Sequence, residues 1–381
     1  MKTVAIITHY HYGCNYGGIL QAYALRKYIE DLGYDAKVID YAWVQSDILH
    51  TNNDNFKFVK VLKRKFNTLI SLIKKYMQIY YFKSGKIRNR KFEEFREKQF
   101  KTTEFVNKDS INKLSEKYDF YIAGSDQVWN PMWFDPNFFL AFVGKDKRKI
   151  AYAASIGVSK LSEYAERKMK PLIDDFYAVS LREEQGVQMI NRFSATEAVN
   201  VLDPTLLLTE KQWDNVNTNL AIKDKYIFCY FLGGNKENRA LAEKVAKKYG
   251  LKIVSLPCVA DISYEEFKWG DIRIFDAGPA EFIGLVDNSE FVITDSFHGT
   301  IFSIIKQKKF VVLKRNLMEN SSSMNSRVVN LLKMVGLESR LVSRIDKIEE
   351  VLNKDIDYDT VEMRIDAKRK QSEDFLVKAL S

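Results

Sequence analysis

One of the four histidines of this chain lies in a short polar segment between two apolar stretches. The segment, residues 294–300, contains His298; residues 291–293 before it resemble a buried strand, and residues 301–305 after it have helical spacing. A loop that leaves a strand and opens a helix presents free backbone N–H groups, and the helix dipole favours negative charge there. We therefore predict an anion-binding loop. Its donors would be Ser296, His298, Gly299 and Thr300.

His298 is a candidate for two roles in such a loop. The imidazole is either a general acid or a cationic donor to phosphate, because a nearby anion favours its protonated form. The alternative is a loop histidine whose hydrogen bonds are satisfied by the backbone. The anion-binding setting favours the functional interpretation.

A second polar segment, residues 124–131, follows the strand predicted at residues 118–123. Asp126 in this segment is either a helix cap, the most frequent use of such a residue, or a base that accepts a proton from a sugar hydroxyl. An amide and an indole beside a carboxylate suit sugar recognition. The candidate sugar-binding residues here are Gln127, Trp129 and Asn130.

Two arginines are candidates for binding a carboxylate or a phosphate. Arg182 follows the strand predicted at residues 178–181, and its guanidinium can form paired hydrogen bonds with either group. The alternative is a surface ion pair with a neighbouring glutamate. Arg327 follows the polar run at residues 320–325 and could close over a phosphate, although a solvated loop is the simpler interpretation.

A glycine-containing segment near the amino terminus lies between a predicted strand and a predicted helix. Its glycines either let the backbone approach a ligand or let the helix pack closely on the sheet. The candidate ligand-binding residues in this segment are Asn15, Tyr16, Gly17 and Gly18. His9, His11 and Cys14 nearby have no carboxylate partner, so we predict no metal site.

Strand and helix patterns alternate in two series along the chain, separated by an irregular stretch at residues 191–224. The simplest account is two doubly wound, Rossmann-like α/β domains that face each other across a cleft, with ligands at the carboxyl ends of both sheets. We place the first domain at residues 1–195 and the second at residues 196–357. A last helix, residues 358–381, is expected to pack back across both.

Size and composition agree with two globular domains. A chain of 381 residues is longer than a domain with a single hydrophobic core usually is. A content of 46% apolar residues excludes a chain that is disordered throughout. Three cysteines form no CxxC pair, which fits a reducing cytosol. Residues 3–25 contain no Asp, Glu, Lys or Arg, but tyrosines, histidines and glycines at their centre suit a loop and not a bilayer. The apolar run at the amino terminus ends too soon for a secretory signal, so we expect none.

Positive charge is concentrated in one segment. Residues 57–101 contain fifteen Lys and Arg against three Glu, a net charge of +12, so the remainder carries −3 of the total of +9. Within an insert at residues 56–101, an apolar helical stripe runs beside lysines. Two interpretations carry equal weight: a helical hairpin that packs on its own domain, or an interfacial helix that binds an anionic membrane through residues 58–101. We predict no nucleic-acid partner and no particular oligomeric state.

Six motifs in order across residues 3–337 resemble the polysaccharide pyruvyl transferase family. No single one would be specific. They are Asn15-Tyr16-Gly17-Gly18, Gly124-Ser125-Asp126-Gln127, Ala151-Tyr152-Ala153-Ala154-Ser155, Ser180-Leu181-Arg182-Glu183, Leu202-Asp203-Pro204-Thr205 and Ser296-Phe297-His298-Gly299.

The resemblance implies a glycosyltransferase-B-like fold and transfer of a pyruvyl group from phosphoenolpyruvate to two hydroxyls of a sugar, as a ketal. It assigns the donor to Arg182 and the His298 loop, and makes Asp126 the candidate acid or base. The implied acceptor is a galactose, ketalated at O4 and O6, in an undecaprenyl-diphosphate-linked precursor of a bacterial surface polysaccharide. The residues expected to bind this acceptor are Asn15, Tyr16, Gly17, Gly18, Gln127, Trp129 and Asn130. The implied location is the cytoplasmic face of the cell membrane.

The chemistry of this reaction matches the candidate residues. An acid, His298 or Asp126, protonates the methylene carbon; Asp126 accepts a hydroxyl proton; and Arg182 with residues 296–300 stabilises the donor's carboxylate and departing phosphate. This scheme requires no cofactor. Two other functions fit the same pattern: a nucleotide-sugar-dependent glycosyltransferase and a non-catalytic carbohydrate-binding protein.

Overall fold

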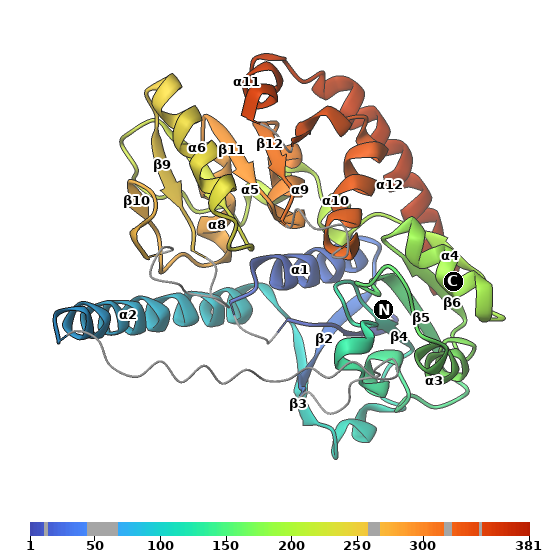
Figure 1. The fold of residues 1–381 in the computed structure, drawn as a ribbon. Coiled ribbons are helices and arrows are strands. Elements are labelled where there is room, and N and C mark those ends of the chain that lie inside the picture. The colour runs from blue at the N-terminus through green and yellow to red at the C-terminus, as the bar shows by residue number, and fades with distance from the viewer. Residues whose placement is uncertain (11–13, 44–67, 258–266, 316–321, 343–344) are drawn as a thin grey trace.

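The computed structural model describes residues 1–10, 14–43, 68–257, 267–315, 322–342 and 345–381 of the chain. Two parallel β-sheets, one in each half of the chain, form its centre, and helix α1 (Tyr16–Asp31) lies between them (Figure 1). The predicted α/β class with two doubly wound units is therefore confirmed.

The first sheet has seven parallel strands in the order β3-β2-β1-β4-β5-β6-β7. The order reverses between β1 and β4, where Val4 pairs with Phe120 on one side and with Ala36 of β2 on the other. The strands are β1 (Thr3–Ile7), β2 (Asp35–Ala42), β3 (Thr102–Asn107), β4 (Phe120–Ala123), β5 (Arg148–Ala154), β6 (Ala178–Leu181) and β7 (Ala198–Asn200).

The second sheet repeats this plan with six parallel strands in the order β10-β9-β8-β11-β12-β13. Its order reverses between β8 and β11. Because helices cover both faces of such sheets, the central strands are continuous apolar runs. The strands are β8 (Tyr226–Tyr230), β9 (Lys252–Ser255), β10 (Ile272–Arg273), β11 (Phe291–Thr294), β12 (Lys309–Leu313) and β13 (Leu341–Val342).

Several helices begin at the carboxyl edges of the strands because a polar side chain caps them there. Asn15 accepts from the Gly18 amide at the start of α1, and Ser296 accepts from the Gly299 amide at the start of α9. The other helices are α2 (Thr68–Gln99), α3 (Glu163–Ile173), α4 (Glu184–Phe193), α5 (Glu210–Asp214), α6 (Lys236–Tyr249), α8 (Pro279–Asp287), α10 (Ser322–Val335), α11 (Ile345–Asn353) and α12 (Tyr358–Leu380), with α9 at Phe297–Ile305. Short 3-10 turns lie at Ile111–Leu114, Pro131–Trp133, Pro136–Phe139, Pro204–Leu206 (η4) and Glu338–Arg340.

One apolar core joins the two halves. It includes buried residues of β1, α1, β8, α8 and α9. Tyr16 stands at the junction: its ring stacks on Phe282 with centroids 5.1 Å apart, and its hydroxyl donates to the Ala277 carbonyl at 2.8 Å. The two halves are therefore packed together through the helices that lie between the two sheets, chiefly α1 and α8.

Helix α12 connects the halves a second time. Near its start, the Tyr358 hydroxyl donates to the Lys308 carbonyl beside β12. At its end, the Tyr34 hydroxyl donates to the Leu380 carbonyl at 3.0 Å, and Arg148 of β5 donates to the Ser381 carbonyl at 2.7 Å. The last helix thus begins against the second sheet and ends against the first.

Two details of the predicted organisation need correction. The boundary at residue 195 falls before β7, which pairs with β6, so the first unit extends at least to Asn200. Sequence patterns missed β7 because three residues show no periodicity. Arg327 lies within helix α10 and is only 8% exposed, so the solvated loop predicted there is wrong.

The described part of the basic insert is one long helix, α2, with no turn between residues 68 and 99 (Figure 1). The carboxyl-terminal part of α2 packs on both halves: Phe92 and Phe95 are buried in the shared core, and Lys91 pairs with Glu281 of α8 at 2.7 Å. Residues 56–67 of the insert lie outside the described residues. Within the described part of the chain, no helix has the length and apolar character of a membrane span.

Candidate active site

The predicted site residues lie where the strand order reverses in each sheet. Asp126 follows β4 at the reversal of the first sheet, and His298 lies in the first turn of α9, directly after β11, at the reversal of the second. Such switch points leave a crevice at the carboxyl ends of the strands, which is where open α/β sheets bind ligands. The topology therefore brings residues from both halves to one place.

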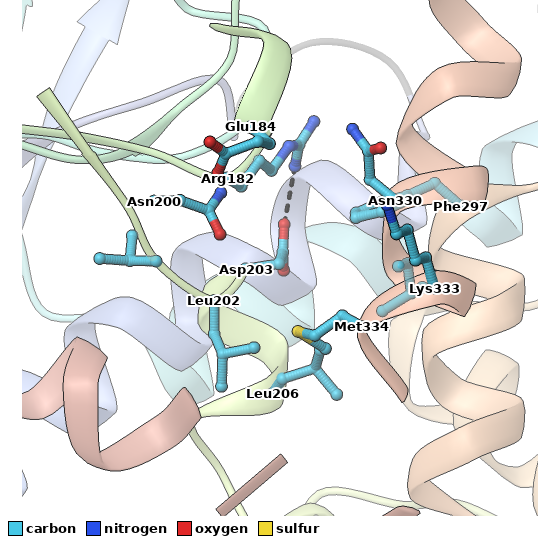
Figure 2. Close-up of a pocket in the computed structure, with 12 residues that line it drawn as sticks. Arg182, Glu184, Asn200, Leu202, Asp203, Leu206, Phe297, Asn330, Lys333 and Met334 are labelled. Atoms are coloured by element: carbon cyan, nitrogen blue, oxygen red, sulfur yellow. Dashed lines mark hydrogen bonds and ion pairs between the residues drawn. The ribbon is translucent and has the colours of Figure 1, made fainter. Parts of the chain in front are cut away.

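Arg182 lies at the centre of this place, with its side chain 1% exposed. Its Nη1 donates to Asp203 Oδ2 at 2.7 Å and to Ser125 Oγ at 3.3 Å, its Nε donates to Glu183 Oε1 at 3.2 Å, and its Nη2 is 3.4 Å from Asp126 Oδ1. Figure 2 shows the bond between Arg182 and Asp203. Three carboxylates therefore surround one buried guanidinium, and the surface ion pair considered from the sequence is wrong.

Asp203 connects the two halves of the site. Its Oδ2 accepts from Arg182 and lies 3.7 Å from His298 Nε2, while its Oδ1 accepts from the Thr205 hydroxyl at 2.6 Å. Burial alone would raise the pKa of Asp203, but His298 and Arg182 more than offset it and hold the pKa well below its usual range. Asp203 lies in one of the six motifs, but its partners could not be predicted because they are distant in the chain.

Asp126 has an unusual backbone conformation, with φ at 71° in the left-handed region. Two bonds to its carbonyl hold this conformation: the Val128 amide donates at 2.8 Å and the Ser155 amide at 3.0 Å. Strain of this kind is often concentrated at functional sites. Asp126 is therefore not a helix cap, the alternative considered from the sequence.

Electrostatics favour the ionised form of Asp126. Burial opposes ionisation, but the charge of Arg182, followed by those of His9, His298 and Arg327, lowers the pKa of this carboxyl below its ordinary value. An ionised carboxylate near neutral pH is suited to accept a proton. It has no proton to donate until it has accepted one.

His298 is 9% exposed, and its Nε2 is buried without a hydrogen-bond partner among the residues that the structure describes. The ring packs against Gly17 of α1, where an added Cβ would overlap Nδ1. A buried nitrogen without a partner costs free energy unless a ligand or water binds it. The absence of a side chain at Gly17 thus allows α1 of the first half to approach His298 of the second half closely.

Arg327 is the second buried guanidinium of the site. Its Cζ lies 5.9 Å from the centroid of the Phe297 ring, and Arg182 Cζ lies 5.0 Å from the same centroid. Burial, followed by repulsion from Arg182, lowers the pKa of Arg327 to about 10. Among the described residues Arg327 has no ion pair, and its Nε has no hydrogen-bond partner. It is a positive charge that the surrounding protein neutralises only weakly.

The model of one protein family, described as polysaccharide pyruvyl transferase, matches residues 15–316. The chain belongs to this family. The matched region contains Asp126, Arg182, Asp203 and His298, and the family is one of transferases. Among proteins of curated function, none matches this sequence.

Solved structures with the same overall architecture include two UDP-GlcNAc 2-epimerases. The one from Methanocaldococcus jannaschii has a TM-score of 0.55 at 16% identity and covers 93% of each chain. The one from Neisseria meningitidis, bound to UDP-GlcNAc, has a TM-score of 0.51 at 13% identity and covers 99% of this chain and 100% of that chain. At these identities the likeness shows the fold alone, and it confirms the glycosyltransferase-B-like arrangement predicted for this pyruvyl transferase family member.

The residues predicted to bind the acceptor have mainly structural contacts. Tyr16 and Trp129 are each 1% exposed; the Trp129 indole donates to the Phe138 carbonyl at 3.2 Å and stacks on Phe139. Neither ring offers a surface to a sugar, so their assignment to the acceptor is corrected: both are core residues. Aromatic residues occur both in apolar cores and in sugar-binding surfaces, so their type alone does not tell which of the two roles they have.

The other predicted binding residues support loops. Asn15 caps α1 beside Gly18, and the Asn130 amide donates to Gln127 Oε1 at 2.7 Å. In the second half, Gly299 donates its amide to Ser296 Oγ and Thr300 donates its hydroxyl to the Ser296 carbonyl. The hydroxyls of Ser296 and Thr300 therefore fix the first turn of α9, which contains His298. Among the described residues no three metal-ligating side chains cluster.

Replacing Gly17 by Ala is expected to displace the His298 imidazole, because the new methyl group would occupy its position. We expect activity to fall at least about tenfold, with a small change in the melting temperature. Gly234→Ala is the matched control, since a Cβ there meets nothing within 4 Å. Equal activity of Gly17→Ala and the control would contradict the assigned contact.

Replacing Asp203 by Asn should lower the free energy of unfolding by about 1.5 to 3 kcal/mol, the usual contribution of a hydrogen bond to a charged group, because Arg182 keeps Asp126 and Glu183 as partners. The carboxylate's pKa is depressed in the folded state, so its stabilisation is present above the unfolded pKa of about 3.9 and is lost as the pH falls below it. Denaturant titrations should show a constant difference between wild type and variant from about pH 8 to 5 that narrows at lower pH. A difference that persists unchanged at about pH 3 would contradict this assignment.

Proposed function

We propose that this transferase moves the pyruvyl group of phosphoenolpyruvate onto two hydroxyls of a sugar. The observation that carries the proposal is a pair of buried nitrogens without a hydrogen-bond partner among the described residues, His298 Nε2 and Arg327 Nε, at the meeting point of the two halves. Buried donors of this kind suit an anionic ligand. Phosphoenolpyruvate supplies a phosphate and a carboxylate.

Arg182 and Arg327 have different roles in this proposal. Arg182 has used its Nε and both Nη1 hydrogens on protein partners, so at most one Nη2 hydrogen is left for a ligand. Its main role is then to hold Asp126 and Asp203 in place, with a smaller part in donor binding than the sequence predicted. Arg327 and the amino-terminal end of α9 bind the donor's negative charge.

The proposed reaction needs one acid and one base. His298 donates a proton to the methylene carbon of the donor, which becomes a methyl group, and the first sugar hydroxyl attacks the adjacent carbon as Asp126 takes its proton. The carbon–oxygen bond to phosphate then breaks, and the phosphate leaves with the proton from Asp126. The second hydroxyl closes the ketal and returns its proton to His298. The depressed pKa of Asp126 supports this allocation.

We further propose the finer features of the acceptor that the family resemblance implies. The acceptor is a galactose, ketalated at O4 and O6, in a lipid-linked precursor of a bacterial surface polysaccharide. Such a precursor lies at the cytoplasmic face of the membrane, where a basic peripheral segment would hold the enzyme near its substrate.

Incubation with phosphoenolpyruvate and a β-galactosyl lipid should release phosphate and add the mass of one pyruvyl ketal to the lipid. His298→Ala should lower the rate at least about a hundredfold, because it removes a positioned acid. Lys252→Ala, on the exposed start of β9, is the control. Transfer from a nucleotide sugar in place of phosphoenolpyruvate, or near-normal turnover of His298→Ala, would contradict the proposal.

The basic insert should bind vesicles that contain anionic lipid, and added salt should weaken this binding, because the attraction is electrostatic. Neutralising Lys63, Arg64, Lys74 and Lys75 together should abolish vesicle sedimentation without lowering turnover on a water-soluble acceptor. Neutralising Lys113, Lys145, Lys168 and Lys244, which lie outside the insert, is the matched control. Equal sedimentation of both variants would contradict a membrane role for the insert.

A further inference from the structure

A pocket of about 350 Å³ lies beside the reaction centre, between the carboxyl ends of β6 and β7 and helix α10. Its volume falls within the range of about 300 to 1,000 Å³ that is usual for small-molecule sites. Figure 2 shows Asn330 and Lys333 of α10 facing Arg182 and Asp203 across it. None of the residues predicted to bind the acceptor lines it.

The walls combine apolar surface with a few polar groups. Leu202, Leu206 and Leu331 are buried and Met334 packs partly against the core, which gives the pocket an apolar side. Among the described residues the Asn330 and Lys333 side chains have no hydrogen-bond or ion-pair partner, although both line the pocket. A pyranose ring presents C–H faces to apolar walls and hydroxyls to amides and charged groups, so it matches this lining.

Charge argues against the donor as the occupant. The pocket contains two carboxylates, Asp203 and Glu184, and the charge of Arg182 is already matched by three carboxylates. Lys333 is the remaining cation of the lining. A donor with a phosphate and a carboxylate would meet repulsion here, whereas a neutral, hydroxyl-rich molecule would not.

The pocket shares its inner wall with the reaction centre. Asp203 lines the pocket and its Oδ2 lies 3.7 Å from His298 Nε2; Phe297 lines it too, and the same ring lies beside the guanidinium of Arg182. A molecule bound in the pocket is thus separated from the histidine by a single side chain. We propose that the pocket binds a saccharide unit of the acceptor, held by Asn330 and Lys333. This inference rests on the proposed function, because it names a subsite for that reaction's acceptor.

The test compares binding of donor and saccharide separately. Calorimetry measures phosphoenolpyruvate binding, and saturation-transfer NMR measures binding of a panel of methyl glycosides that includes methyl β-galactoside. Wild type should bind both. Met334→Trp, which fills the pocket, should abolish the glycoside signal and leave phosphoenolpyruvate affinity within about twofold. Asn330→Ala should raise the KM for the acceptor about tenfold at an unchanged KM for phosphoenolpyruvate, the effect expected for one lost hydrogen bond.

Val329→Ala is the control, because Val329 lies on α10, is exposed and does not line the pocket. If Met334→Trp does not fold, Asn330→Ala and Lys333→Ala on the rim of the pocket decide the question. A wild type that binds phosphoenolpyruvate but no glycoside, or variants with unchanged acceptor KM, would overturn the subsite and leave the donor proposal standing. Pocket-dependent glycoside binding without phosphoenolpyruvate binding would overturn the donor proposal and support the subsite.

Discussion

The buried guanidinium of Arg182 is the constraint on which the rest of the site depends. A cation with a side chain 1% exposed is stable only if carboxylates surround it, and Asp126, Glu183 and Asp203 supply them from three separate points of the chain. The ends of β4 and β6 and the turn η4 are thereby fixed relative to one another. Through Asp203 the same network reaches His298 of the second sheet.

The position of His298 is fixed by packing between the halves as well as by charge. The shared core extends from β1 through α1 to β8 and α9, so the two sheets are held by buried apolar contacts close to the site. Tyr16 and Gly17 are neighbours in α1 with different roles. The Tyr16 ring fills the junction between the halves, and the missing side chain of Gly17 leaves room for the His298 imidazole. A site built in this way is organised before a ligand binds.

Much of this arrangement could be predicted from the sequence, because it depends on local patterns. Apolar runs followed by polar segments placed Asp126, Arg182 and His298 at the carboxyl ends of strands, and parallel topology then brought them together. The position of Asp203 could not be predicted, since its partners are distant in the chain and its own segment is irregular. Trp129 and Arg327 were misjudged for a related reason: whether a ring is buried, or a polar run is helical, is decided by tertiary packing.

Arg182 and Arg327 differ in the charges that surround them, and this difference separates the place for an anionic ligand from the place for a neutral one. Both guanidinium groups lie near Phe297, yet one is matched by three carboxylates and the other has no ion pair among the described residues. Burial and repulsion from Arg182 lower the pKa of Arg327, so its charge costs more free energy here than in water, although the group remains protonated near neutral pH. In the proposed function, the negative charge of the bound donor offsets the free-energy cost of burying the Arg327 charge. Arg182, whose charge is balanced by carboxylates, lines the pocket beside α10. An uncharged ligand bound there is not repelled by these carboxylates.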